Sequence, residues 1–264
     1  MHRQARAYAP GSVTTVFAPG DEPGGGSLGV SVAVEDGVVA TVEPADETVI
    51  RLDGEATSFE PVERALDRLG VRAVVSLDAG VPVGCGFGAS GAATLATALA
   101  ANEAFVLGEP RGTLVGVAHR AEVAAGTGLG DVFVQSRGGL VWNVGGGIRR
   151  ARCDARVEYA ALGGIATEAV LGDERALARV REAGRATLDR IDPTGAFDAL
   201  LDRSWAFARR TGLATDPVVE AVARVQRAGG VGTMAMVGET VIATGVEGVL
   251  DRETRVTNEG AHVR

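Results

Sequence analysis

Lysine is absent from this chain of 264 residues, in which all 26 basic residues are arginine. The P-loop of nucleotide-binding proteins places a lysine on the phosphates, so its absence excludes that class of phosphate site. Cysteine and histidine are scarce, with 2 and 3 residues, and their positions match no metal-binding spacing. A zinc cluster is therefore not expected.

Acidic residues outnumber basic ones, and long apolar runs are absent. The net charge is −8, whereas a protein that binds nucleic acid needs a basic face. No apolar run approaches the roughly 18 residues of a membrane-spanning helix, and the first residues lack the apolar segment of a secretory signal. We expect a cytoplasmic protein without nucleic-acid or membrane partners, and the sequence is compatible with a homodimer.

Glycine, by contrast, is abundant, and three glycines alternate within the run Pro82–Ala93 (Gly84, Gly86 and Gly88). The residues that follow, 89–107, are rich in strong helix formers. A glycine loop that opens a helix can bind phosphate, because the first N–H groups of a helix are unpaired and its N-terminal end is positive. Ser90, in the first turn, can reach a phosphate oxygen or the metal ion that a phosphate carries.

Two other interpretations of this loop are open. It can be a turn that only lets a helix pack closely on a strand, since dense glycine is common in turns. The segment Gly86–Gly91 also fits the dinucleotide-binding fingerprint in form. However, Asp78–Pro82 separates the glycines from the preceding strand, and no acidic residue ends a second strand about 20 residues further on. The dinucleotide interpretation is therefore disfavoured.

Periodicity predicts elements on both sides of the loop. Before it, we expect a hairpin of strands 28–34 and 38–43 around a turn at 35–37, and a helix over 59–69 that ends at Gly70. After it, we expect helices over 112–125, 174–189, 195–210 and 217–228, a strand over 157–162 and a hairpin over 234–245. The polar tail after Asp251 is expected to fray.

Two carboxylates follow the predicted loop in sequence. Glu122 shares one face of the helix over 112–125 with His119, and Asp131 ends a second glycine loop. Glu122 is of the type that holds magnesium, and Asp131 suits a general base or an orienting group for an acceptor hydroxyl. The alternatives are a solvated charge for Glu122, a helix cap for Asp131 and a packed or surface histidine for His119. Together with the loop, these residues favour phosphoryl transfer from a nucleotide.

With these residues in hand, the sequence resembles the GHMP kinase superfamily. The resemblance lies in Pro82–Ala92, in Ala9–Val13, in residues 118–139 and, more loosely, in Gly229–Gly245. It implies an α+β fold of two lobes, residues 1–150 and 151–264, with ATP and Mg²⁺ between them. It also implies metal ligands at Ser90 and Glu122, and catalytic roles for these two and Asp131. The nucleotide-binding residues implied are Pro82, Gly84, Gly86, Phe87, Gly88, Ala89, Ser90 and Gly91.

Within the superfamily, residues 118–139 most resemble the archaeal pantoate kinases. This implies phosphorylation of pantoate to 4-phosphopantoate in coenzyme A biosynthesis, with Ser27, His119, Asp131 and Thr167 at the substrate pocket. One departure concerns the acceptor: Trp142-Asn143 stands where an arginine for the substrate carboxylate is expected. Arg137, Arg149 and Arg150 are candidates to replace it. Mevalonate, homoserine and shikimate are alternative acceptors, and a non-catalytic ligand-binding protein of the same fold is a further alternative.

Overall fold

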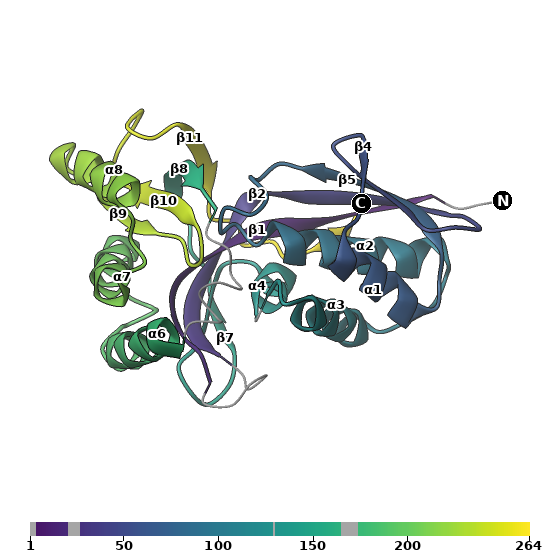
Figure 1. The fold of residues 1–264 in the computed structure, drawn as a ribbon, viewed down its shortest axis with the longest axis horizontal. Coiled ribbons are helices and arrows are strands. Elements are labelled where there is room, and N and C mark those ends of the chain that lie inside the picture. The colour runs from purple at the N-terminus through teal and green to yellow at the C-terminus, as the bar shows by residue number, and fades with distance from the viewer. Residues whose placement is uncertain (1–3, 21–26, 129, 165–173) are drawn as a thin grey trace.

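The computed structural model of the chain is built on two β-sheets flanked by helices (Figure 1), and it describes residues 4–20, 27–128, 130–164 and 174–264. The helices are α1 (Glu60–Leu69), α2 (Ala89–Ala104), α3 (Arg111–Ala125), α4 (Asp131–Arg137), α6 (Glu174–Leu188), α7 (Phe197–Thr211) and α8 (Asp216–Arg227). The strands are β1 (Ala5–Ala18), β2 (Leu28–Pro44), β3 (Val49–Leu52), β4 (Glu55–Thr57), β5 (Ala73–Ala79), β6 (Leu140–Asn143), β7 (Arg149–Ala151), β8 (Arg156–Gly163), β9 (Val231–Met234), β10 (Glu239–Thr244), β11 (Arg252–Arg255) and β12 (His262–Val263).

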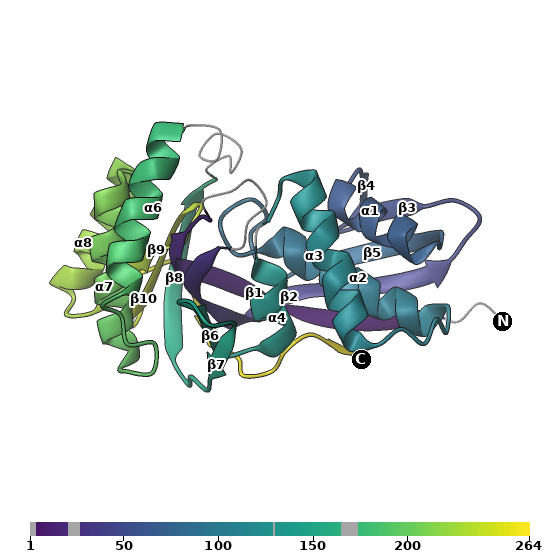
Figure 2. The same cartoon turned by 90° about the horizontal axis from the view of Figure 1, so that it is seen from below.

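The larger sheet has 8 strands in the described part of the chain, in the order β12-β1-β2-β5-β3-β4, with β6 added to β2 and β7 to β6. The helix α2 packs on β1 and β2, and α1 and α3 pack in turn on α2. Figure 2 shows these three helices on one face of the sheet. α2 is buried along nearly its whole length because its alanines, glycine and threonines let sheet and helices approach it closely.

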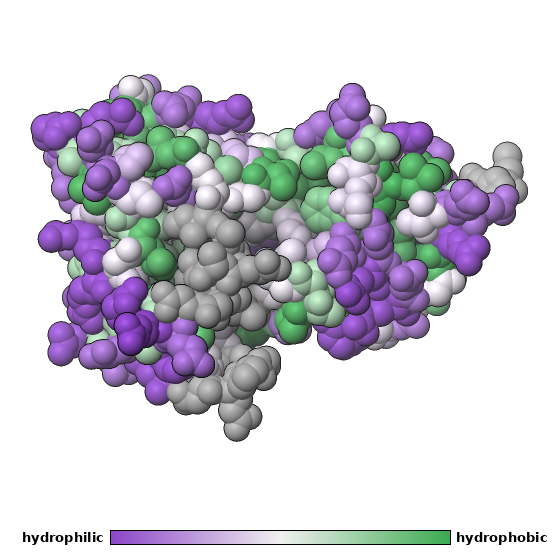
Figure 3. All heavy atoms as spheres, viewed as in Figure 1, coloured by the Kyte–Doolittle hydropathy of each residue, from purple (hydrophilic) through white to green (hydrophobic). Residues whose placement is uncertain are grey.

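The smaller sheet has 4 strands in the order β11-β8-β10-β9, and the helices α7 and α8 pack against it. α6 packs on β1 of the larger sheet and on α7, so it links the two sheets. Figure 3 shows hydrophilic residues over the lower right of the molecule, where α1 and α3 lie. Within the described ranges, no helix is both long and apolar enough to span a bilayer.

The hairpin predicted at residues 28–43 is wrong, because this segment forms the single strand β2, paired with β1 along its length. Residues 35 and 36 are extra residues in this ladder, since Pro10 pairs with Gly37 while Gly11 pairs with Val34. They form a bulge, which bends a strand without ending it. Gly37 is needed for close packing and not for a turn, because a Cβ there would lie 2.2 Å from the Ala9 carbonyl oxygen.

The prediction that the tail frays is also wrong. Residues His262 and Val263 form β12, which pairs with β1, and the N–H of Arg264 donates to the Arg6 carbonyl at 2.8 Å. The Arg264 guanidinium lies over the Tyr8 ring, 4.5 Å from its centre. A polar end of the chain is ordered here because the edge of β1 offers it unpaired backbone groups.

Most other predicted elements are confirmed. The helix predicted over 59–69 is α1, and Gly70 ends it in the left-handed conformation with φ of 70°. The three helices of the second half and the hairpin of β9 and β10 are present. The α+β fold of two sheets with helices is confirmed. The division at residue 150 and the homodimer stay predictions.

Candidate functional site

The glycine loop before α2 depends on its three alternating glycines. Gly84, Gly86 and Gly88 all have positive φ, at 76°, 90° and 61°. Other residues rarely adopt this conformation, so the alternation sets the path of the backbone. Gly88 also precedes α2 directly and provides no side-chain cap. The first N–H groups of this buried helix therefore stay available to an anion.

The loop is held from three sides. Phe87 is buried, and its ring meets that of Tyr159 in the smaller sheet edge to face, with centres 4.7 Å apart. The Ser12 N–H donates to the Phe87 carbonyl at 2.8 Å, and the Thr240 hydroxyl donates to the Cys85 carbonyl at 2.6 Å. The loop thus contacts both sheets, and its backbone is hydrogen-bonded to β1 and to β10.

Glu122 is buried behind the loop, on α3, with a side chain only 2% exposed. Three hydroxyls donate to its carboxylate: Ser90 at 2.9 Å and Thr94 at 2.7 Å to Oε1, and Thr127 at 2.8 Å to Oε2. Burial raises the pKa of Glu122, and these hydrogen bonds offset that rise only in part. The charged form of this side chain therefore lacks a compensating positive charge.

Asp131 opens α4, and its carboxylate and that of Glu122 both lie close to Gly128. A Cβ on Gly128 would lie 3.1 Å from Glu122 Oε2 and 3.9 Å from Asp131 Oδ2. Asp131 lines the pocket, and its Oδ1 accepts from the Ser12 hydroxyl at 3.0 Å. Desolvation raises the pKa of Asp131, and the bond from Ser12 lowers it. The fold therefore brings two carboxylates to one place beside the glycine loop.

A magnesium ion would suit Ser90 and Glu122. Both offer oxygen, and the Ser90 hydroxyl keeps its lone pairs free while its hydrogen goes to Glu122. In the described ranges, no three His, Cys, Asp or Glu side chains form a metal cluster. Few protein ligands are typical of a magnesium ion that is carried by phosphates. The residues present thus fit this ion.

His119 lines the pocket, and its ring packs against that of Phe133 in a tilted arrangement, with ring centres 4.6 Å apart and planes at 47°. Its Nδ1 atom is buried without a hydrogen-bond partner in the described structure. Burial, and then the nearby Arg120, lowers the pKa of His119. The ring is therefore a neutral group with an unused polar atom, which leaves it able to meet a ligand.

One pocket of about 350 Å³ gathers most of the predicted residues. From the loop, Gly84, Gly86, Gly88, Ala89 and Ser90 line it, together with Ser27, His119 and Asp131. Phe87 is buried, and Pro82 and Gly91 lie outside the lining, while Glu122 stands behind Ser90. Thr167 lies outside the described residues.

The predicted replacement arginines do not line the pocket. Arg150 donates to the carbonyls of Gly138 and Asn258, and Arg137 donates to the carbonyl of Phe133. Arg149 is exposed on β7. The lining formed by the described residues contains no arginine, whereas Trp142 and Asn143 both belong to it.

Sequence reasoning missed several polar residues at the site. Thr14 and Ser31 pair across β1 and β2, with hydroxyl oxygens 2.8 Å apart, and both line the pocket. Ser12 and Gln135 are buried beside Asp131. One signal was available, since Ser12 and Thr14 are two residues apart and share one face of a strand. No sequence signal pairs either residue with its distant partner.

Comparisons with known proteins agree with this geometry. The family described as "GHMP kinases N terminal domain" matches residues 57–139, which contain the glycine loop and both carboxylates. The pantoate kinase of Methanospirillum hungatei is 26% identical over 256 residues, covering 90% of this chain and 86% of that protein. The pantoate kinase of Methanocaldococcus jannaschii is 24% identical, covering 80% and 82%.

The fold has a close counterpart among solved structures. A protein described as "Phosphotransferase related to CoA biosynthesis pathway" superposes with a TM-score of 0.86 at 22% identity, with 99% of each chain covered. The family match therefore falls on the segment that builds the pocket, within a fold shared over the full length. Residues 57–139 thus match the GHMP kinases N terminal domain, and the fold over the full length is that of the solved phosphotransferase.

Proposed function

We propose that the chain is an ATP-dependent kinase that phosphorylates a hydroxyl of pantoate to give 4-phosphopantoate, a step towards coenzyme A. The observation that carries the proposal is the placement of two carboxylates, Glu122 and Asp131, close to Gly128 and beside the glycine loop. Phosphoryl transfer needs a place for the phosphates, a cation for their charge and a group that orients the acceptor. The relatives named as pantoate kinases support pantoate as the acceptor.

The phosphate side of the proposed site is the loop Gly84–Ser90 and the N-terminus of α2. Their N–H groups stabilise the charge on the phosphate oxygens, and the fixed loop backbone costs little ordering on binding. Ser90 and Glu122 would hold Mg²⁺, which neutralises charge on the phosphates. Glu122 stands ready for a cation because its charge is buried among neutral hydroxyls.

The acceptor side combines apolar and hydroxyl groups. Phe133, Val141 and Trp142 offer surface for the two methyl groups of pantoate. Ser27, His119 and Asn143 offer polar atoms for its hydroxyl and carboxylate oxygens. Neutral hydrogen-bonding groups can bind a carboxylate without an arginine, although each bond is weaker than a charged pair.

The chemical step follows from these positions. The hydroxyl oxygen of pantoate attacks the γ-phosphorus of ATP, and the bond from that phosphorus to the β,γ-bridging oxygen breaks as ADP leaves. The proton of the hydroxyl is released, and Asp131 either takes it or orients the oxygen for attack. Since only an ionised Asp131 can do either, turnover is expected to fall as the pH drops through its raised pKa.

A panel of acceptors tests the proposal. The purified protein is given ATP and Mg²⁺ with pantoate, mevalonate, homoserine or shikimate, and ADP release and the phosphorylated product are measured. We expect turnover with pantoate and at most traces with the others. Strong turnover of another alcohol and none of pantoate overturns the acceptor. No turnover with any acceptor, combined with tight binding of ATP, favours a non-catalytic binding protein.

A further inference from the structure

Gln135 on α4 has no role in the reaction as derived so far, yet its side chain is fully buried next to the site. Its Nε2 donates to the Gly88 carbonyl at 2.7 Å and to the Ser12 hydroxyl oxygen at 3.1 Å. A carbonyl oxygen can only accept, so the amide nitrogen must face Gly88. This contact sets the orientation of the amide and uses both of its hydrogens.

The orientation of Gln135 decides where the hydrogen of Ser12 goes. Ser12 is fully buried, and its hydroxyl has one hydrogen to donate. Because its oxygen accepts from Gln135, that hydrogen goes to Asp131 Oδ1, 3.0 Å away. Gln135, Ser12 and Asp131 therefore form a chain of hydrogen bonds with a single direction.

The same contacts tie this chain to the phosphate loop. A Cβ on Gly88 would lie 2.3 Å from Ser12 Oγ and 2.7 Å from Gln135 Nε2, and one on Gly91 would lie 2.9 Å from Gln135 Oε1. A side chain at Gly88, or at Gly91 in the first turn of α2, would therefore displace Ser12 or Gln135. The loop backbone, Ser12 and Gln135 thus pack as one unit, so a carboxylate held by Ser12 is held relative to the phosphates.

The charged side chains around Asp131 leave the Ser12 hydroxyl as an important donor to its carboxylate. No arginine of the described residues lines the pocket, and the chain has no lysine. The titratable groups that the packed helix α3 contributes are Glu122 and His119, whereas β1 and α2 contribute Ser12 and Ser90. The described side chains thus give Asp131 a neutral hydrogen-bond donor and no cation.

We propose that Gln135 and Ser12 are positioning residues, in which Gln135 fixes the Ser12 hydroxyl and Ser12 holds the Asp131 carboxylate towards the acceptor hydroxyl. This inference rests on the proposed role of Asp131 as the acceptor-side group. Neither residue lines the pocket. Their contribution is the alignment of a carboxylate with the phosphate loop, which matters because misplacement by about 1 Å can cost a hundredfold in rate.

The test compares S12A and Q135M with T97V in steady-state kinetics with ATP and pantoate. Thr97 is the matched control, since its hydroxyl is buried on α2 without a hydrogen-bond partner in the described structure. S12A is expected to lower kcat about 10- to 100-fold, as the loss of one hydrogen bond to a charged group does, with KM for ATP within about twofold. Q135M is expected to lower kcat about tenfold, and T97V to leave it unchanged.

Two readouts separate positioning from a general packing role. Since Gln135 acts on Asp131 through Ser12, the double variant S12A/Q135M is expected to have the kcat of S12A; losses that multiply overturn the relay. The acid limb of the kcat/KM profile is expected at higher pH in S12A than in the wild type, because Asp131 loses a donor that favours its charged form. An unmoved limb overturns the role of Ser12.

A third variant, D131N, separates this inference from the proposed function. If D131N keeps full turnover, the role of Asp131 in the proposed function is wrong. If D131N abolishes turnover while S12A and Q135M behave like T97V, only the positioning inference is wrong. Should S12A fail to fold, S12C carries the same test, because a thiol nearly preserves the volume and is a weak donor.

Discussion

Two buried glutamates, one in each half of the molecule, show how the same side chain can serve the fold or the site. Glu122 on α3 is 2% exposed and Glu158 on β8 is 4% exposed. Each carboxylate accepts three hydrogen bonds. The pKa is nevertheless raised for Glu122 and lowered for Glu158. At Glu122 burial and the nearby Asp131 raise the pKa more than three hydroxyl donors lower it, whereas at Glu158 three backbone N–H donors and Arg156 outweigh burial.

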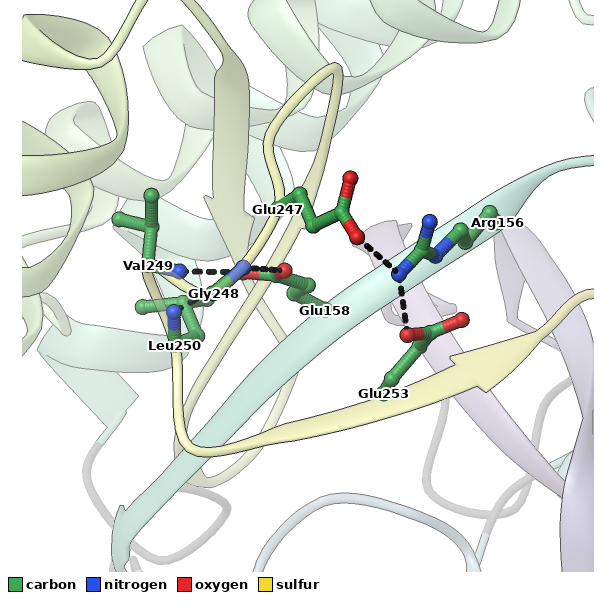
Figure 4. Close-up of polar contacts among 7 residues, drawn as sticks. All are labelled: Arg156, Glu158, Glu247, Gly248, Val249, Leu250 and Glu253. Atoms are coloured by element: carbon green, nitrogen blue, oxygen red, sulfur yellow. Dashed lines mark hydrogen bonds and ion pairs between the residues drawn. The ribbon is translucent and has the colours of Figure 1, made fainter.

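Backbone N–H groups surround Glu158. Figure 4 shows its carboxylate at the loop between β10 and β11, where it accepts from the N–H groups of Gly248, Val249 and Leu250. Burial disfavours its charge, but these three bonds, with a smaller contribution from Arg156, outweigh burial and lower the pKa. Backbone N–H groups cannot rotate away from the carboxylate. The charge of Glu158 therefore holds the loop in place and is satisfied by it.

Hydroxyl groups surround Glu122, and two of them have a second acceptor within reach. The Thr94 hydroxyl also lies 2.9 Å from the Ser90 carbonyl, and that of Thr127 lies 3.3 Å from the Glu122 carbonyl. Each hydroxyl has only one hydrogen, so it can turn from the carboxylate to the other acceptor. The donors of Glu122 are therefore exchangeable, and its charge remains available to a cation.

The largest effect is expected from E122Q, which removes the charge and keeps the shape. We expect kcat with ATP and pantoate to fall about 10²- to 10³-fold, the scale of losing one electrostatic stabiliser of the transition state. The unfolding midpoint should not fall, since a buried uncompensated charge is replaced by a neutral amide. Kinetics and thermal unfolding of the same sample test both parts. Full activity in E122Q would contradict the assignment of Glu122 to the site.

For E158Q we expect the reverse of E122Q, a loss of stability with little change in kcat. The amide of glutamine would turn an NH₂ group or a weaker acceptor towards the three N–H groups, and the free energy of unfolding should fall by about 2 kcal/mol. The kcat of the folded enzyme should stay within about twofold, because the loop at 248–250 contributes no residue to the pocket lining. Urea unfolding and kinetics measure the two effects. A large loss of kcat without a loss of stability would refute the contrast.

The pH dependence of stability sharpens the contrast. The pKa of Glu158 is lower in the folded protein than its ordinary value of 4.5, so its contribution is complete above pH 4.5 and is lost as the pH falls through the folded pKa. We therefore expect the stability gap between the wild type and E158Q to narrow below pH 4.5 and to be constant near neutrality. Urea midpoints of both proteins across this range measure the gap. A gap that widens in acid would show that the charge of Glu158 does not stabilise the fold.

The smallest effect is expected from R156Q, beside Glu158 on the same strand. Arg156 is exposed and pairs with Glu253 at 2.5 Å and Glu247 at 3.6 Å (Figure 4). Exposed ion pairs contribute little because water and salt screen them. The thermal midpoint of R156Q should stay within the error of the measurement, and kcat should not change. A drop comparable to that of E158Q would mean that exposed pairs, and not buried donors, order this region.

Local signals in the sequence were sufficient for much of the fold and part of the site. The glycine loop was predictable because alternating glycines before a helix leave few other backbone paths, and Gly84, Gly86 and Gly88 all have positive φ. The bulge at residues 35 and 36 was not, because an acidic pair followed by glycine is also typical of a hairpin turn. The pairing of β12 with β1 depends on an edge that only the assembled sheet provides.

By itself, the sequence excluded a P-loop, since it contains no lysine, and it indicated which residues offer oxygen atoms near a helix N-terminus. These properties are local, because they depend on residue chemistry and on neighbouring backbone. Only the tertiary structure decided how Asp131 is held. Ser12 and Gln135 stand 119 and 123 residues from the partners they bond. Contacts between residues so far apart in sequence arise from the packing of β1, α2 and α4, and no spacing along the chain predicts them.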